Sequence, residues 1–129
     1  MAVTHSTAAR NAATDAVTAL IGADGNLCFR TTGTVGSPGT VVATLPLSTD
    51  AFADSDTGTA TANTITSDTN ATGNASAVAT ATLQTSGGTV VIHCAVAASA
   101  SDINMSGGLT VAAGDTVSCS SLTYTALSA

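Results

Sequence analysis

Residues 89–97, TVVIHCAVA, are the most strongly apolar run of the chain and follow the turn residues 86–88 (SGG). The β-branched residues of this run favour an extended conformation, in which side chains alternate between two faces. Because nearly every position is apolar on both faces, we expect a central strand that is covered on both sides, rather than an edge strand. The two predicted faces consist of Val90, Ile92, Cys94 and Val96, and of Val91, His93, Ala95 and Ala97.

Other strand-like segments surround this run at intervals of roughly ten residues. The turns between them are rich in Gly, Pro, Asn and Asp, and this pattern is typical of a β-sandwich or barrel. We predict a mainly β fold, an antiparallel and jelly-roll-like sandwich or barrel of about seven or eight strands. The expected strands, besides residues 89–97, are residues 27–32, 41–47, 59–66, 75–84, 102–105, 109–112 and 116–126, with 27–32 pairing with 41–47, and 75–84 with 89–97.

The N-terminal segment predicts one α-helix that ends near Ile21. Ser6 or Thr7 can cap its start, and Gly22 can end it. Its apolar residues recur at helical spacing and form one stripe, which must pack against the domain's own core or against a partner subunit. We therefore expect an N-terminal helix or assembly arm in residues 1–22 and a β-sandwich domain in residues 23–129. The stripe consists of Ala9, Ala13, Ala16, Val17, Leu20 and Ile21.

Composition excludes several kinds of partner. The chain of 129 residues fits one domain, carries a net charge of −6, and contains only Arg10 and Arg30 as cations. Binding to nucleic acid or to an anionic membrane surface requires several Lys or Arg contacts, so we expect neither partner. No apolar run approaches the ~18 residues of a membrane span, and no basic segment precedes an apolar one at the N-terminus, so we expect a chain made in a cytosol.

The low charge also bears on assembly. Charged residues make up 8% of the chain, against roughly 25% in ordinary soluble domains. Thr, Ser, Ala and Gly take their place, which favours a surface that neighbouring subunits cover. The alternative is a free monomer with a sheet coated by Thr and Ser.

The cysteines and histidines form no recognisable site. Cys28, Cys94 and Cys119 are odd in number and far apart, so we expect small, buried, reduced side chains. A Cys94–Cys119 bridge would require an oxidising compartment. His5 and His93 lack metal-ligand spacing, and His93 and Cys94 would point to opposite faces of a strand. We expect His93 to be a hydrogen-bonded strand or interface side chain.

No motif for nucleophilic, zinc-dependent or phosphate-binding chemistry is present. Two Asp-rich turns, residues 54–58 and 68–73, resemble the start of calcium loops. An EF-hand requires Glu at its twelfth position, where this chain has Ile65 and Ala79. Asx turns explain both segments better. We therefore predict a non-enzymatic protein and name no catalytic, cofactor-binding or metal-binding residue.

Several short segments along the chain resemble segments of a known group of proteins. They are STAARNAATDAV (6–17), ANTITSDT (62–69), GTVVI (88–92), SDINM (101–105) and AAGDTVSCSSLTYTA (112–126). In these segments the chain resembles small proteins encoded in the structural-gene regions of tailed bacteriophages and prophages. The resemblance implies a virion protein made in the host bacterial cytoplasm, most simply a head decoration or cement protein on the capsid surface. Its implied partners are the major capsid protein and copies of itself, for instance in a trimer.

A tail or fibre module of the virion that binds host carbohydrate is the alternative. Such a module would expose an aromatic platform for sugar rings. The only aromatic residues of the chain are Phe29, Phe52 and Tyr124.

Overall fold

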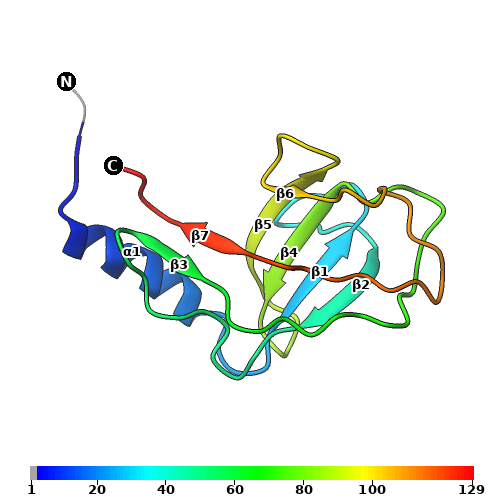
Figure 1. Cartoon of the computed structure of the whole chain (residues 1–129), viewed down its shortest axis with the longest axis horizontal. Helices are drawn as coiled ribbons and strands as arrows, with labels where there is room; N and C mark the ends of the chain where they lie inside the picture. Colours follow the sequence, from blue (N-terminus) through cyan, green and yellow to red (C-terminus); the bar gives the residue numbers. More distant parts are fainter. Residues whose placement is uncertain (1–2) are drawn as a thin grey trace.

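The computed structural model describes residues 3–129, and in this part of the chain one helix precedes seven strands (Figure 1). The prediction of a mainly β fold with an N-terminal helix is confirmed. The elements are α1 (Thr7–Ala19), β1 (Asn26–Arg30), β2 (Val41–Pro46), β3 (Thr59–Thr61), β4 (Thr80–Gln84), β5 (Val90–Ala97), β6 (Ile103–Asn104) and β7 (Thr123–Thr125).

Helix α1 begins and ends close to the predicted residues. The Ser6 hydroxyl accepts a hydrogen bond of 3.2 Å from the Ala9 amide, so Ser6 is the N-cap. The Ile21 amide bonds to the Thr18 carbonyl, three residues back, which tightens the last turn. Gly22 follows with a φ of 70°, a left-handed conformation that ends the helix.

Five strands form one curled sheet in the order β2-β1-β4-β5-β6, and β3 and β7 form a small second sheet. Both predicted hairpins are confirmed, because β1 pairs with β2 and β4 pairs with β5, each in antiparallel fashion. The register places Leu27 of β1 between Leu45 and Leu83. The one parallel pairing joins β6 to the end of β5.

The prediction that residues 89–97 are covered on both sides is wrong for most of their length. All five residues of β4 are buried, whereas only Val96 is buried in β5. Strand β6 pairs only with Val96 and Ala97, so most of β5 lies at the border of the sheet. The burial of a strand depends on neighbours that lie far away in the sequence. Here β1 pairs with the other edge of β4, so β4 and not β5 is the central strand.

A bulge changes the predicted faces of β5. Leu83 pairs with Ile92, but Gln84 pairs with Val90, so Val91 is an extra residue in the ladder. As a result Val91 packs against the core beside Ile92, and not on the opposite face with His93 as strict alternation predicts. The alternation holds beyond the bulge.

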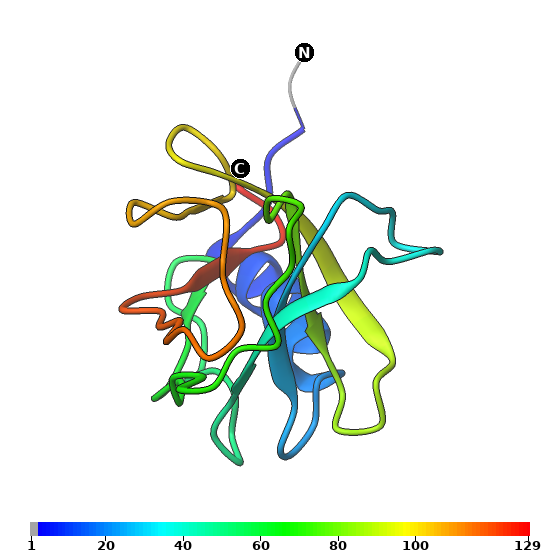
Figure 2. The ribbon, with the colours of Figure 1, turned by 90° about the vertical axis from the view of Figure 1, so that its right-hand side faces the viewer.

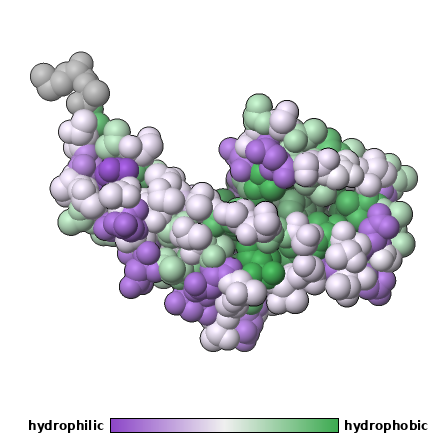
Figure 3. All heavy atoms as spheres, in the orientation of Figure 1, coloured by the Kyte–Doolittle hydropathy of each residue, from purple (hydrophilic) through white to green (hydrophobic). Residues whose placement is uncertain are grey.

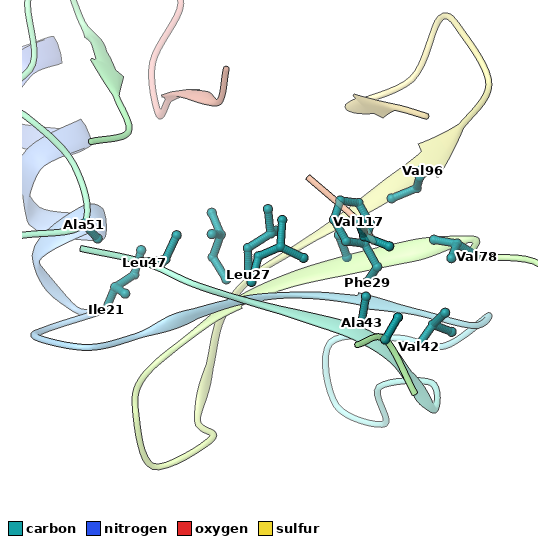
Figure 4. Packing of buried hydrophobic residues seen from close by; sticks show 14 of the residues in the cluster. Ile21, Leu27, Phe29, Val42, Ala43, Leu47, Ala51, Val78, Val96 and Val117 are labelled. Atoms are coloured by element: carbon teal, nitrogen blue, oxygen red, sulfur yellow. The ribbon is translucent and has the colours of Figure 1, made fainter. Parts of the chain in front are cut away.

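The hydrophobic core lies on one face of the five-stranded sheet (Figure 4). Leu27 and Phe29 of β1 contribute its centre, and Val96 of β5 its border. The opposing layer consists mainly of irregular segments, which contribute Leu47, Ala51, Phe52, Ala71, Val111 and Val117.

Several predicted strands are therefore shorter than expected or lack strand structure. The expected strand 116–126 is reduced to β7, the expected strand 59–66 to β3, and residues 109–112 form no strand. Isolated backbone hydrogen bonds hold these segments instead, such as the one from the Val78 amide to the Leu109 carbonyl at 2.8 Å. Their Ala-, Thr- and Gly-rich sequences offer little apolar area for a continuous ladder.

The outer edge of β2 is covered by residues 66–73. The Thr66 amide donates to the Pro46 carbonyl and the Gly73 amide to the Val42 carbonyl, both at 2.9 Å. Between them the Asp68 carboxylate accepts a hydrogen bond of 2.9 Å from the Thr44 amide. This edge of the sheet is therefore closed to further strands.

Candidate functional site

The polar face of α1 attaches the helix to its own chain. Thr14, the buried residue of the helix, is fully inaccessible to solvent. Its hydroxyl donates a hydrogen bond of 2.6 Å to the Gly58 carbonyl and accepts one of 3.1 Å from the Ala126 amide. One threonine thus joins the helix to the turn before β3 and to the segment after β7.

Three neighbouring polar side chains reinforce this attachment. They reach the same turn and the same C-terminal segment, so the small β3–β7 sheet and α1 form one unit at the end of the molecule away from the large sheet (Figure 1). The Arg10 guanidinium donates to the carbonyls of Leu127 (3.1 Å) and Thr57 (2.7 Å), Asn11 Oδ1 accepts from the Gly58 amide (2.7 Å), and Asp15 Oδ1 accepts from the Ser55 amide (2.9 Å).

The opposite face of α1 is apolar and exposed. Leu20 is 66% exposed, and the alanines around it are exposed as well. Of the predicted apolar stripe only Ile21 is buried, and Ala13 and Val17 are half-buried. The helix therefore packs on its own domain through polar groups and presents its apolar side to solvent. The exposed face comprises Ala8, Ala9, Ala12, Ala16, Ala19 and Leu20.

A hollow of about 650 Å³ lies between residues 102–111 and the segment 115–123, on the core side of the large sheet. Figure 3 shows this side of the molecule, with hydrophobic residues in the hollow. Apolar lining comes from Phe29, Met105 and Leu122 among others. The carboxylates of Asp102 and Asp115 each accept a backbone hydrogen bond of 2.9 Å, so they act as turn-stabilising groups.

Arg30 lies on the other face of the large sheet and organises a polar cluster there. Its guanidinium donates to Thr82 Oγ1 (3.0 Å), to Gln84 Oε1 (2.9 Å) and to the Gly39 carbonyl (2.8 Å). The Thr82 hydroxyl in turn donates to Gln84 Oε1 at 3.0 Å. These bonds explain how two polar side chains stay buried in β4, and they assign Arg30 a structural role.

All three cysteines are free thiols, and Cys28 is buried while Cys94 and Cys119 are half-buried. Burial raises the pKa of Cys94 to about 11, and the negative charge of Asp102 adds to this shift. Burial also raises the pKa of Cys28 and Cys119. The thiols are thus protonated and poorly nucleophilic at neutral pH. Of the expected burial, the full extent holds only for Cys28.

The two histidines lie far from each other. His5 Nδ1 lies 2.7 Å from the Ala129 carbonyl, so it links the N-terminal segment to the C-terminal one. His93 lies on the outer face of the sheet, beside Thr82. Its Nε2 atom is buried and has no hydrogen-bond partner within residues 3–129. The expectation of a hydrogen-bonded His93 is therefore wrong for this atom.

The Asp-rich turns have different hydrogen bonds. Asp68 Oδ1 accepts a bond of 3.0 Å from the Asn70 amide, which confirms an Asx turn there. At residues 54–58 the acceptors come from the Asn11 and Asp15 side chains of the helix, so the expected Asx turn is not the main stabilising feature.

In residues 3–129 no three His, Cys or Asp side chains lie close enough together to hold a metal ion. No helix in this part of the chain has the length and hydrophobicity to cross a membrane.

Comparison of the chain with protein-family models, with curated protein sequences and with solved structures gives no match. The sequence left open whether the apolar face of α1 packs on its own domain or on a partner subunit, because the orientation of the helix depends on polar partners more than 40 residues away in the chain. The sequence does contain a sign of this orientation, because the helix also has a strongly polar face. Either this face or the apolar stripe could have packed on the domain. The polar face consists of Arg10, Asn11, Thr14 and Asp15.

Proposed function

We propose that this chain is a non-enzymatic structural protein of a virus particle, most simply a decoration protein that binds across subunits of the major capsid protein. The exposed apolar face of α1 supports this proposal more than any other observation. An apolar helix face that its own domain leaves uncovered is available to a partner, although by its size alone it does not exceed the patches found on monomers. The sequence resemblance to structural proteins of tailed bacteriophages supplies the partner.

The size of this face favours a repeated lattice over a single partner. A helix of 13 residues is about 20 Å long and about 10 Å wide, so one face offers roughly 200 Å². A stable interface between two proteins buries about 800 Å² on each partner. The helix face is thus one of several contacts, and many copies on a regular shell make weak contacts effective together.

Burial of the aromatic residues weighs against the carbohydrate-binding alternative. Phe29 is 2% exposed and Phe52 is 5% exposed, so neither can stack on a sugar ring. Tyr124 is half-buried at its place in β7. A sugar-binding platform would require at least one open aromatic face.

Co-sedimentation with capsids tests the proposal. Capsids of the phage or prophage that encodes this chain, assembled without it, would be mixed with the purified protein. We expect saturable binding at a fixed ratio to the capsid protein. The double variant Ala12→Glu/Ala16→Glu keeps good helix formers while charging the apolar face, and we expect it to bind at least about tenfold more weakly.

The control variant Ser76→Glu/Ser106→Glu adds the same charge at two exposed loop positions away from β5. We expect it to bind as the unmodified chain does. Equal binding of the helix variant would refute the docking role of α1, and absence of binding to any shell would refute the capsid role. Binding to isolated tails instead would favour the tail or fibre alternative.

A further inference from the structure

The border of the large sheet at β5 is open. Strand β6 pairs only with Val96 and Ala97, and within residues 3–129 no strand pairs with the outer edge of Val90–Cys94. Figure 2 shows β5 at the outer border of the sheet. The opposite border, at β2, is closed by residues 66–73, so the sheet can grow in one direction only.

The hydrogen-bonding pattern identifies the free backbone groups. The Val96 amide donates to the Ala79 carbonyl on the side of β4. Because inward and outward groups alternate along an antiparallel strand, Cys94 also faces β4, while His93 and Ala95 face away. The Ala95 amide confirms this direction, since it donates to Asp102 at 2.9 Å. The N–H and C=O groups of His93 are therefore the unpaired ones at the middle of the open edge.

This edge has few of the features that natural proteins use to block pairing. Edge strands are commonly protected by Lys, by Pro, by a short length or by a bulge. Strand β5 has eight residues, the longest in the chain, and contains neither Lys nor Pro. Its bulge lies at Val91, at one end of the open stretch. The backbone groups of His93 are thus free to pair with another strand, while Asp102 and β6 occupy the edge at residues 95–97.

We propose that β5 pairs with β5 of a second copy in antiparallel fashion, around a two-fold axis next to His93. In this arrangement the two His93 residues exchange their N–H···O bonds, as a hydrogen-bonded antiparallel pair does. The shared ladder is confined to residues 92–94 of each copy, because Asp102 and β6 occupy the outer edge of residues 95–97. Residues 90–97 contain no Asp, Lys or Arg. The carboxylate of Asp102 does lie at this edge, and it accepts the hydrogen bond of the Ala95 amide. Because the β2 edge is closed, the assembly ends at two copies and does not extend into a fibre.

The experiment measures the mass of the full chain by analytical ultracentrifugation across a wide range of concentrations. We expect a monomer–dimer equilibrium. Amide hydrogen exchange provides a local reading: the His93 amide should become protected as the concentration rises, while the Ala95 amide should already be protected in the monomer. This inference does not depend on a role in a virus particle.

His93→Pro is the sharpest variant, because Pro is tolerated where the N–H of an edge strand faces solvent. We expect it to fold and to dimerise at least about tenfold more weakly. Its matched control, Cys94→Pro, removes an inward N–H and should fail to fold. His93→Asp places two carboxylates opposite each other in the dimer, so we expect it to dimerise more weakly as well. This variant tests the proposal if His93→Pro does not fold.

A purely monomeric or trimeric chain would overturn the proposal. So would a dimer of unchanged affinity in His93→Asp, since the charges would then lie apart. The control variant Thr61→Asp adds the same charge at an exposed position of β3, and it should dimerise as the unmodified chain does.

Discussion

Replacing Thr14 with valine tests whether polar groups hold α1 on its domain. Valine has nearly the shape of threonine but cannot donate to the Gly58 carbonyl or accept from the Ala126 amide, the two bonds that the Thr14 hydroxyl makes. Both backbone groups then lose their partner. Because Gly58 is buried and Ala126 is half-buried, water can reach the second group more easily than the first.

The expected loss of stability follows from these two groups. A buried group left without a partner costs about 1–3 kcal/mol, so we assign about 2 kcal/mol to the Gly58 carbonyl and about 1 kcal/mol to the Ala126 amide. Burial of the additional methyl group returns about 0.8 kcal/mol. We therefore expect Thr14→Val to lower the free energy of unfolding by about 2 kcal/mol, and Tm by about 6–8 °C for a domain of this size.

Urea unfolding followed by circular dichroism measures this change, and amide exchange in α1 shows whether the helix detaches first. Thr14→Ser is the matched control, because it keeps the hydroxyl and loses only a methyl group. The reasoning is refuted if the free energies of unfolding of the Val and Ser variants agree within about 0.5 kcal/mol, the usual size of a neutral substitution.

Three further predictions concern other parts of the chain. Arg30→Lys keeps the charge but loses the planar fork over β4, and urea unfolding should show a loss of about 1–2 kcal/mol. Gly73→Ala should destabilise by more than about 2 kcal/mol, because its Cβ would clash with the Ala113 amide nitrogen and the φ of 72° is unfavourable for alanine. Gly88→Ala, with a φ of 92° and free space around it, should cost only about 1 kcal/mol. The pKa of Cys94 is about 11 in the folded chain and 9.0 ordinarily, so the unfolded chain releases this proton first and stability should fall as the pH rises from 9 to 11. Cys94→Ala should show a flatter pH dependence over that range, and an equal slope would contradict this explanation.

Local sequence signals predicted the elements that depend on local chemistry. The cap at Ser6 and the stop at Gly22 mark α1, and apolar runs separated by Gly-rich turns mark the two hairpins of the large sheet. These features require only neighbouring residues, so the sequence alone suffices to find them.

The central position of β4 and the orientation of α1 could not be predicted in this way. Strand β4 is central because β1, about 50 residues earlier in the chain, inserts beside it and supplies Arg30 to its polar face. Threonine and glutamine in β4 suggest an exposed face until that partner is known. In α1 the buried residue is Thr14, whose partners lie 44 and 112 residues away. Long-range hydrogen bonds thus outweighed the apolar stripe.

The two proposed surfaces lie on separate parts of the molecule, and together they predict how tightly the chain binds a shell. Helix α1 packs on the β3–β7 sheet at one end, whereas β5 lies in the large sheet (Figure 1). A dimer formed through β5 leaves both helix faces free and can bind two equivalent sites of a lattice at once. Binding at the second site is then intramolecular, which strengthens overall binding about 10²-fold or more where the geometry allows both contacts. At concentrations where the unmodified chain is a dimer and His93→Pro is a monomer, the variant should therefore bind capsids about 10²-fold more weakly, although its helix face is intact. Equal binding of the two proteins would show that each helix binds the shell independently and that the dimer has no role there.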